Sequence, residues 1–477
     1  MTDSRSAATR TAPSGGPASV AAVPETPVAT PDADAELLRL GYQPSLRRNL
    51  GLGALLVYGL LFFVPMAPVA VFGIVVNRSH GVPMLVYLVA AAIMGLSAVS
   101  YREMALRFPV AGSVYGYVRL STNPFWGFVA GWLILLDYIL MPALLTILSA
   151  VALAHILPGI PPAVFAALFV GASLAMNLRG LEITTRIGLV LLAIQLVVIG
   201  LFVAIVLAAA AAGKIHLTAE ALWRPETSWA AVLSAVPIAA LSFLGFDAVA
   251  TLNEEARGGG RAVALATSLL LGLITALFCV QLWAASVVTN ATSFAEGPAT
   301  NRAFYVAVDA VAPAWFTPVF TLTNAFVAIF ACLVVAHAAS ARLLFAMGRD
   351  GALPPAFART NARGVPTVAT WVIGLIALAV SVGFAEKAEL MTSLVTFGAM
   401  SSYVLLHAGV VVRCLGTERS RRWLTHLIVP VLGAAALVTA LLRSSAITLA
   451  VGLGWLSLGL VGYAAWAVIR RRGGRRA

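Results

Sequence analysis

The chain has 477 residues, of which 61% are hydrophobic and only 10% charged, and its mean hydropathy is +0.95. This composition excludes a soluble globular protein and indicates a polytopic helical membrane protein. The formal net charge of +12 is explained by basic residues at the inner ends of membrane spans, so nucleic acid is not an expected partner.

The N-terminal segment is rich in Ala, Pro, Ser, Thr and Gly and has no apolar core. We expect residues 1–45 to form a disordered cytoplasmic tail, because such a composition cannot bury enough apolar surface to fold. The segment lacks the apolar stretch of a signal peptide, so the tail should be retained.

Twelve apolar runs follow, each suited to cross a bilayer as a helix. They lie at 50–76, 83–108, 125–157, 161–177, 183–211, 229–255, 263–288, 315–347, 366–384, 390–413, 427–442 and 446–470. They are too long and continuous for the alternating strands of a barrel. The expected fold class is therefore all-α and polytopic, with twelve transmembrane helices in one membrane domain at 46–472 and a basic cytoplasmic tail at 473–477.

The distribution of the 31 basic residues orients the chain. With a cytoplasmic N-terminus, six of them fall in outside loops: Arg78, Lys214, Arg224, Arg302, Lys387 and Arg443. The other 25 then lie on the inside. The positive-inside rule therefore predicts a multi-pass protein of the cytoplasmic membrane with both termini in the cytoplasm.

Two of the runs contain residues that interrupt a helix near its middle. The first run carries Pro65, Pro68 and Gly73, which one unbroken helix cannot hold together. The sixth run carries Ser242, Gly245 and Asp247, which suit an interrupted helix that lines a cavity.

The two interruptions are five runs apart, which predicts two inverted repeats at about 50–211 and 229–413, followed by extra helices at 427–470. This is the plan of a secondary transporter that binds its solute between the broken helices. Proline kinks or a glycine packing notch would explain either break alone, but they explain the pair less well.

Three segments carry a resemblance to a known family: SYREMALRFPVAGSVYGYVRLSTNPFWGFVAGWLILLDYILMP, SFLGFDAVATLNEEAR and SARLLFAMGRDGALP. From about Arg47 to Arg472 the chain resembles the amino acid/polyamine/organocation superfamily of permeases, and within it bacterial putrescine-importer-type members. The resemblance implies a leucine-transporter-like fold with a 5+5 inverted repeat and two C-terminal helices. It also implies import of amino acids or polyamine-like amines by alternating access.

The first break departs from the pattern of that family. Carriers of this superfamily typically have a Gly-rich break that holds a substrate carboxylate, and putrescine-importer-like members tend to place an acid there. This chain has two prolines instead, and Ala70 stands where the acid is expected. The resulting prediction is a less polar lining whose residues are Val64, Pro65, Met66, Ala67, Pro68, Ala70 and Gly73.

The other predicted substrate-binding residues are Asp137, Tyr138, Ser242, Phe243, Gly245, Phe246 and Asp247. A charged side chain in mid-membrane costs at least about 2.5–3.5 kcal/mol, so acids there indicate function. Asp137 is expected to receive a substrate ammonium or a coupling proton. Interhelical hydrogen bonding for Asp137 and helix capping for Asp247 remain alternatives. Phe243 and Phe246 could gate the site or serve only as packing aromatics.

Coupling to H⁺ or Na⁺ is left open by the sequence. His337, in the inner half of the eighth run, could carry a coupling proton, although a structural hydrogen bond is the alternative. Gln195 occupies a position where several proton-coupled relatives, by resemblance, carry a lysine.

Charged residues gather at the expected cytoplasmic ends of the runs. Glu103, Glu254, Glu255 and Arg342 could form an inner gate of ion pairs, or they could be ordinary interfacial charges. Arg107, Arg349 and Asp350 belong to the same group by topology.

No enzyme or ATP-binding motif is present in the sequence, and its three cysteines form neither a disulfide framework nor a metal site. The expected function is a secondary active transporter that acts without a cofactor, metal or ATP. Its expected partners are a small amine or amino acid and the lipid bilayer, and H⁺ or Na⁺ is the candidate coupling ion. An exchanger of amino acids or amines and a non-transporting amine sensor are the alternatives.

Overall fold

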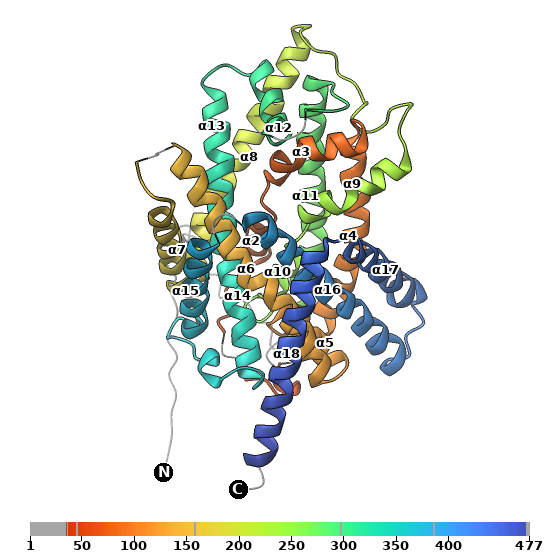
Figure 1. Cartoon of the computed structure of the whole chain (residues 1–477). Helices are drawn as coiled ribbons and strands as arrows, with labels where there is room; N and C mark the ends of the chain where they lie inside the picture. Colours follow the sequence, from red (N-terminus) through yellow and green to blue (C-terminus); the bar gives the residue numbers. More distant parts are fainter. Residues whose placement is uncertain are drawn as a thin grey trace, which may run out of the picture.

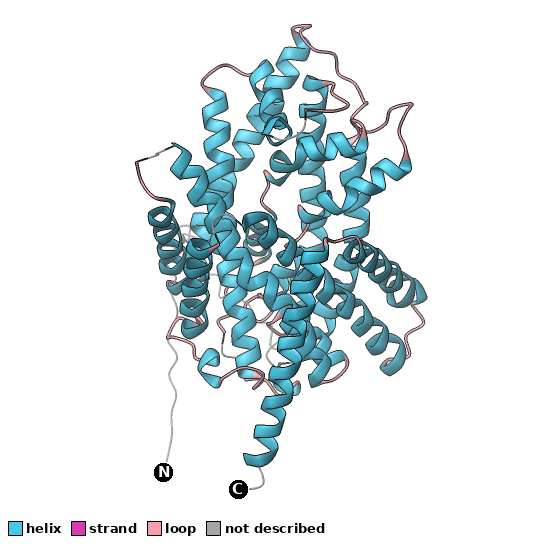
Figure 2. Cartoon of the chain, in the orientation of Figure 1, coloured by secondary structure: helices cyan, strands magenta, loops and turns pink. Residues whose placement is uncertain are grey.

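The computed structural model describes residues 35, 37–43, 46–156, 159–295, 298–384 and 387–473. Within these ranges the chain is a bundle of helices joined by loops, and its only extended pairings are two isolated bridges, Leu50 with Ala256 and Thr360 with Pro366 (Figure 2). The all-α fold class predicted from composition is confirmed.

The helices up to residue 211 include one interrupted span and one short helix outside the spans. They are α2 (Leu52–Phe63), α3 (Ala67–Ser79), α4 (Pro83–Arg107), α5 (Ser113–Ser121), α6 (Pro124–Ile156), α7 (Pro162–Leu178) and α8 (Leu181–Ala211). In Figure 1, α5 lies at the lower end of the bundle, whereas α3 and α12 (Pro298–Val311) lie toward the upper end.

The helices from 229 to 417 begin with a second interrupted span. They are α9 (Trp229–Leu241), α10 (Phe246–Ala250), α11 (Gly259–Thr289), α12, α13 (Phe316–Leu322), η1 (Thr323–Ala328), α14 (Ile329–Arg349), η2 (Pro355–Ala358), α15 (Thr367–Gly383), α16 (Ala388–Val411) and η4 (Val412–Thr417). The chain then continues through η5 (Leu424–Ile428), α17 (Val429–Leu442) and α18 (Ala446–Gly473).

The described helices are consistent with twelve spans. Nine are long and apolar enough to cross a membrane, and α2 with α3 forms a tenth span that is bent by 46° at its break. The two shorter apolar helices, α7 and α15, have 17 residues each and match the fourth and ninth predicted runs.

The core of the bundle forms around α6, which packs against α5, α7, α14, α15 and α16. The interrupted spans lie beside it: α2 contacts α10, α11 and α14, and the Tyr58 hydroxyl of α2 donates to the Val335 carbonyl of α14 at 2.7 Å. Figure 1 shows α2 and α10 close together at the centre. Both helix breaks therefore lie in the interior, where freed backbone groups need partners.

Most of the predicted N-terminal tail, residues 1–34, 36 and 44–45, lies outside the described residues. The described part of it packs on the protein: the side chains of Leu37 and Tyr42 are buried, with 1% and 8% of their surface exposed. Ordered chain thus begins before the boundary at residue 45, because these two apolar side chains join the core.

Candidate functional site

The first break separates α2 from α3 at Val64, Pro65 and Met66. Val64 has a φ of 54°, in the left-handed region, and Pro68 lies in the first turn of α3, where a proline costs no hydrogen bond. Two carbonyls freed by the break find donors on other spans. Gln281 Nε2 donates to the Pro65 oxygen at 2.9 Å, and Cys332 Sγ donates to the Phe62 oxygen at 3.2 Å.

The second break lies at Ser242–Gly245, between α9 and α10. Gly245 has a φ of 136°, a conformation that L side chains rarely adopt, and a Cβ added there would lie 2.6 Å from Phe62 Cδ1. The Ser242 and Tyr87 hydroxyls are 2.9 Å apart. The two breaks therefore pack directly against each other, through Gly245 and Phe62.

Two buried acids lie beside the breaks. Asp137 of α6 is 2% exposed and Asp247 of α10 is 1% exposed, and their carboxyl groups lie close enough to interact electrostatically. The Tyr138 hydroxyl donates to Asp247 Oδ2 at 2.6 Å. Asp137 Oδ1 has no hydrogen-bond partner within the described residues. The structure thus brings Asp137, Tyr138 and Asp247 together, and it leaves one carboxylate oxygen available to a cation.

Aromatic rings enclose the acids on one side. Phe246 lies 5.3 Å from Tyr101, 5.5 Å from Tyr403 and 6.5 Å from Phe63, measured between ring centroids. Tyr101 and Tyr403 were not among the predicted residues, because an isolated tyrosine in an apolar run gives no signal of the cluster that it joins. Phe246 thus belongs to an aromatic cluster with Tyr101, Tyr403 and Phe63, next to Asp247 in the chain, and its role as a gate stays a prediction.

Phe243 points elsewhere. Its ring lies 5.8 Å from that of Tyr87 on α4 and 5.3 Å from that of Phe278 on α11. This arrangement supports the alternative that Phe243 is a packing aromatic.

The remaining residues of the first predicted lining fall on α3 rather than in the break. Ala70 is exposed. Gly73 packs against α12, where an added Cβ would collide with the Thr300 carbonyl oxygen. Gly73 thus permits a close approach of two helices, whereas Pro65 and Pro68 shape the break itself.

His337 joins three helices. Its Nε2 donates to the Thr370 carbonyl of α15 at 2.8 Å, and its Nδ1 lies 3.0 Å from Ser173 Oγ of α7. Both ring nitrogens are therefore occupied, which supports the structural alternative for this residue. Gln195 is likewise buried, and its Nε2 donates to the Leu191 carbonyl at 3.3 Å within α8.

Ion pairs join the segment after α10 to the C-terminal end of α14. The Arg342 guanidinium binds both Glu255 carboxylate oxygens, and both partners are buried. Arg349 binds Glu254 with two hydrogen bonds of 2.8 and 2.7 Å. Glu254 Oε1 also accepts from the Ala111 backbone amide at 2.8 Å. Bidentate, largely buried pairs of this kind are stronger than exposed ones.

The segment before α2 covers these ion pairs. The Leu50 amide donates to the Glu255 carbonyl at 3.0 Å, and the Arg257 amide donates to the Leu50 carbonyl at 2.9 Å. Nearer the N-terminus, the Tyr42 ring lies 4.4 Å from the Arg349 guanidinium carbon. Burial raises the pKa of Tyr42 to about 12, so its hydroxyl is a neutral donor, and it donates to Asp350 Oδ2 at 3.3 Å. The segment before α2 is thus tied by hydrogen bonds and a ring contact to the residues that carry these ion pairs.

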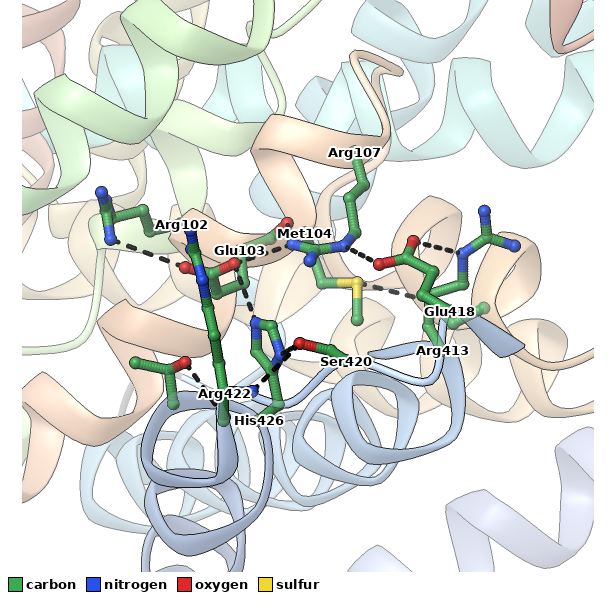
Figure 3. A network of polar contacts seen from close by, with 11 residues as sticks. Arg102, Glu103, Met104, Arg107, Arg413, Glu418, Ser420, Arg422 and His426 are labelled. Carbon is green, nitrogen blue, oxygen red and sulfur yellow. Dashed lines mark hydrogen bonds and ion pairs between the residues drawn. The ribbon is translucent and has the colours of Figure 1, made fainter. Parts of the chain in front are cut away.

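Glu103 belongs to a different cluster, between the end of α4 and the η4–η5 connection (Figure 3). It accepts from Arg107 Nη1 at 2.8 Å and lies 3.2 Å from His426 Nε2. Glu418 accepts from Arg107 and Arg413, each at 3.0 Å. Partial burial alone would raise the pKa of Glu418, but the two guanidinium groups hold it below its usual value. The structure does not bring Glu103 together with Glu254, Glu255 and Arg342.

Two interrupted spans that pack against each other at their breaks, beside a pair of buried acids, are the arrangement of a helical membrane transporter. The chain belongs to the amino acid permease family, whose model matches residues 54–462. The family and the relatives below are transporters.

The chain is similar along most of its length to curated relatives. It is 28% identical to the low-affinity putrescine importer PlaP of Escherichia coli K12, over 87% of this chain and 93% of the relative. It is 24% identical to the branched-chain amino acid permease BcaP of Bacillus subtilis, over 88% of this chain and 93% of the relative.

Among solved structures, the chain shares its fold with a Na⁺-coupled sialic acid symporter in a substrate-bound outward-open state. The TM-score is 0.51 at 13% sequence identity, and the match covers 86% of this chain and 92% of the other. The resemblance noted in the sequence to an amine and amino acid permease family is confirmed.

Proposed function

We propose that the protein imports a small amine-bearing solute across the cytoplasmic membrane by secondary active transport, with the solute bound between the two breaks. The observation that carries the proposal is the buried pair Asp137 and Asp247, with Asp137 Oδ1 lacking a donor within the described residues. Buried carboxylates without a cation are costly, so an ammonium group placed between them is strongly favoured.

The roles of the site residues follow from this placement. Asp137 accepts the ammonium group, while Tyr138 orients Asp247 through its hydrogen bond. Phe246 covers the solute, and Val64, Pro65 and Met66 supply the apolar wall of the first break. Ser242 and Gly245 allow α9 and α10 to move relative to each other.

Relatives of two substrate classes support an amine as the solute. PlaP imports putrescine and BcaP transports branched-chain amino acids, as their names state. An amino group is the feature that these solutes share.

Coupling to H⁺ or Na⁺ uses the same carboxyl pair in this proposal. A proton or Na⁺ neutralises Asp137 or Asp247 when no ammonium is bound. Solute and ion are therefore coupled because both neutralise the same pair of carboxylates. The sialic acid symporter of similar fold is Na⁺-coupled, which favours testing Na⁺ first.

The direction of transport rests on the expected orientation of the chain. The outside loops hold six of the 31 basic residues, so the positive-inside rule places both termini in the cytoplasm. The ion pairs of Glu254 and Glu255 then close the cytoplasmic side. In this orientation the repeats 50–211 and 229–413 rock against each other, and the helices at 427–470 stay outside that motion.

Counterflow in proteoliposomes tests the proposal. Vesicles loaded with an unlabelled amine or amino acid should accumulate the labelled solute transiently, and wild-type protein should do this for at least one member of an amine and amino acid panel. A sensor would bind a ligand without any counterflow. Binding is detected as a rise in the melting temperature, since a ligand at a hundredfold excess over Kd stabilises the folded state by about 2.7 kcal/mol. An exchanger would show counterflow but no net uptake into empty vesicles, even with an H⁺ or Na⁺ gradient.

A further inference from the structure

Two neighbouring cavities lie beside the second interrupted span, and they differ in their chemistry. The first, of about 300 Å³, lies between α9, α16 and the α17–α18 connection, and arginine, serine and threonine side chains form much of its wall. The second, of about 250 Å³, lies between α4, α9 and α17, and its lining is apolar apart from Thr439 and Arg443. Pro237, Met400, Ala440 and Arg443 line both cavities. The two are therefore adjacent and form one site with a polar end and an apolar end.

The polar end is positively charged. Arg78 and Arg443 line it and are exposed, and neither guanidinium has a hydrogen bond or ion pair within the part of the chain that the structure describes. The Ser393 hydroxyl likewise has no partner among the described residues, and no Asp or Glu of the described chain belongs to the lining. The predicted outside loops hold only six of the 31 basic residues, yet two of these six meet here. The expected occupant of this end is therefore an anion.

The two ends lie at the depths that a phospholipid occupies. Arg443 is the C-cap residue of α17, and Arg78 lies in the last turn of α3, so both guanidinium groups lie at the ends of spans, near the headgroups. The apolar end is lined by Ala436 of α17 and by Ile93 and Met94 near the middle of α4. Ala436 and Arg443 are about 10 Å apart along the helix axis, and one hydrocarbon leaflet is about 15 Å thick. The site thus extends from the headgroup region into the acyl-chain region.

The apolar end is open to the bilayer. Leu233 of α9 lines it and is 50% exposed, and Thr439 of α17 lines it and is also exposed. Both residues belong to candidate membrane spans, so their exposed surfaces contact lipid. Figure 1 shows α17 at the edge of the bundle. A lipid can therefore enter this site from the side.

We propose that Arg78 and Arg443 bind the phosphate of an anionic phospholipid such as phosphatidylglycerol, whose acyl chain lies in the apolar cavity between α4, α9 and α17. The guanidinium groups form charge-assisted hydrogen bonds with the phosphate, and the Ser393 hydroxyl donates a further one. The net negative charge of this lipid distinguishes it from zwitterionic lipids, because the cationic group of a zwitterionic headgroup is repelled by the two arginines.

The lipid site lies on the opposite side of the helix breaks from the ion pairs of Glu254 and Glu255. Along the sixth span, its residues Ser234 and Leu241 precede the break, whereas both glutamates follow it. In the orientation expected from the basic residues this is the outer side, so the lipid belongs to the outer leaflet. None of the described residues that line the two cavities belongs to the proposed solute site.

The test titrates the detergent-purified protein with phosphatidylglycerol and follows its melting temperature. Phosphatidylcholine supplies the same phosphate without a net charge, and inorganic phosphate supplies an anion without acyl chains. The variants are Arg78→Gln/Arg443→Gln for the polar end, Ala436→Phe for the apolar end and Arg302→Gln as control. Arg302 is an exposed arginine of α12 that lines neither cavity.

Phosphatidylglycerol should raise the melting temperature of wild type until the site is saturated, because it binds the folded state. Phosphatidylcholine and inorganic phosphate should raise it much less. Each guanidinium removed should weaken the binding of phosphatidylglycerol about fivefold, which corresponds to about 1 kcal/mol per arginine. Ala436→Phe should weaken it as well, because the new ring fills the apolar cavity, and the melting transition without lipid shows that this variant is folded. Arg302→Gln should behave as wild type.

Three results would overturn the proposal. Equal stabilisation by phosphatidylcholine would mean that lipids solvate the protein without recognition of charge. Equal stabilisation by inorganic phosphate, or unchanged lipid binding by Ala436→Phe, would mean that no acyl chain occupies the apolar cavity. Unchanged binding by the double arginine variant would mean that the arginines only complement the helix dipoles of α3 and α17. The measurement needs no transport, so missing counterflow together with saturable lipid binding would contradict the import function alone.

Discussion

At the scale of single residues, the two buried acids of the site differ in their hydrogen bonds. Asp247 has a tyrosine hydroxyl as donor, whereas Asp137 Oδ1 has no hydrogen-bond partner within the described residues. A buried acceptor without a donor lowers the stability of the folded protein by about 1–3 kcal/mol, and by more when the acceptor is charged. Such an acceptor in a native protein needs an explanation, and a bound ligand that supplies the donor is one. We therefore expect Asp137, rather than Asp247, to contact the solute directly.

Replacing Asp137 by Asn should raise the KM for uptake about 10- to 100-fold, because a hydrogen bond to a charged group is worth about 1.5–3 kcal/mol. The measurement is the initial rate of uptake against solute concentration in proteoliposomes, repeated across pH. Asp309→Asn is the matched control, since Asp309 is exposed on α12. Wild-type KM and wild-type pH dependence in Asp137→Asn would remove both the ammonium role and the proton role.

His337, unlike Asp137, has hydrogen-bond partners for all its polar side-chain atoms. Its two ring nitrogens join α14 to α7 and α15, so His337→Gln should lower the thermal stability of the purified protein, by about 1–3 kcal/mol for the broken hydrogen bonds. The variant should keep the wild-type pH profile of uptake. A changed pH profile at unchanged stability would instead support a coupling role for His337.

At the scale of elements, the sequence was most informative about the breaks. Pro65, Pro68 and Gly245 are residues whose backbone preferences are local, so both interruptions could be predicted without contacts, and the described helices are consistent with the twelve predicted spans. Contacts between distant segments could not. Gly73 belongs to a helix contact with α12, and Phe243 and Phe246 face different neighbours, although they are only three positions apart.

The same limit applies to the charged residues. The order of the predicted spans placed one group of charged residues, Glu103, Glu254, Glu255 and Arg342, on the same side of the membrane. Only the packing of α4 against η5, and of α14 beside the end of the sixth span, separates Glu103 from the other three.

The second break gives the element-scale prediction. Gly245→Ala should abolish uptake while the protein still inserts and purifies, because the new Cβ meets Phe62 and the φ of 136° is strained for alanine. Gly272→Ala in α11 is the matched control, since its added Cβ has nothing within 4 Å. Normal transport by Gly245→Ala would mean that this segment is a packing notch rather than a hinge.

At the scale of the whole molecule, the bidentate ion pairs of Glu254 and Glu255 lie at one end of the bundle, on one side of the two helix breaks. The opposite end holds the cavity beside Arg78 and Arg443. Alternating access requires the end with the ion pairs to open, and the two bidentate ion pairs are the contacts that must break. Their strength should therefore set how often the site opens at the Glu254 and Glu255 end.

Cys332 can report that opening, because its thiol lies at the first break and is 1% exposed. In a background with Cys279→Ser and Cys414→Ser, Glu254→Gln should speed the labelling of Cys332 by a membrane-permeant maleimide. Each 1.4 kcal/mol lost from the closed state raises the open population about tenfold while that population is small. Glu220→Gln is the matched control, since it breaks the Arg224 ion pair of 2.8 Å at the other end. Equal labelling rates in the two variants would show that the Glu254 pair closes nothing, and the inner gate would then rest on Glu255 and Arg342 alone.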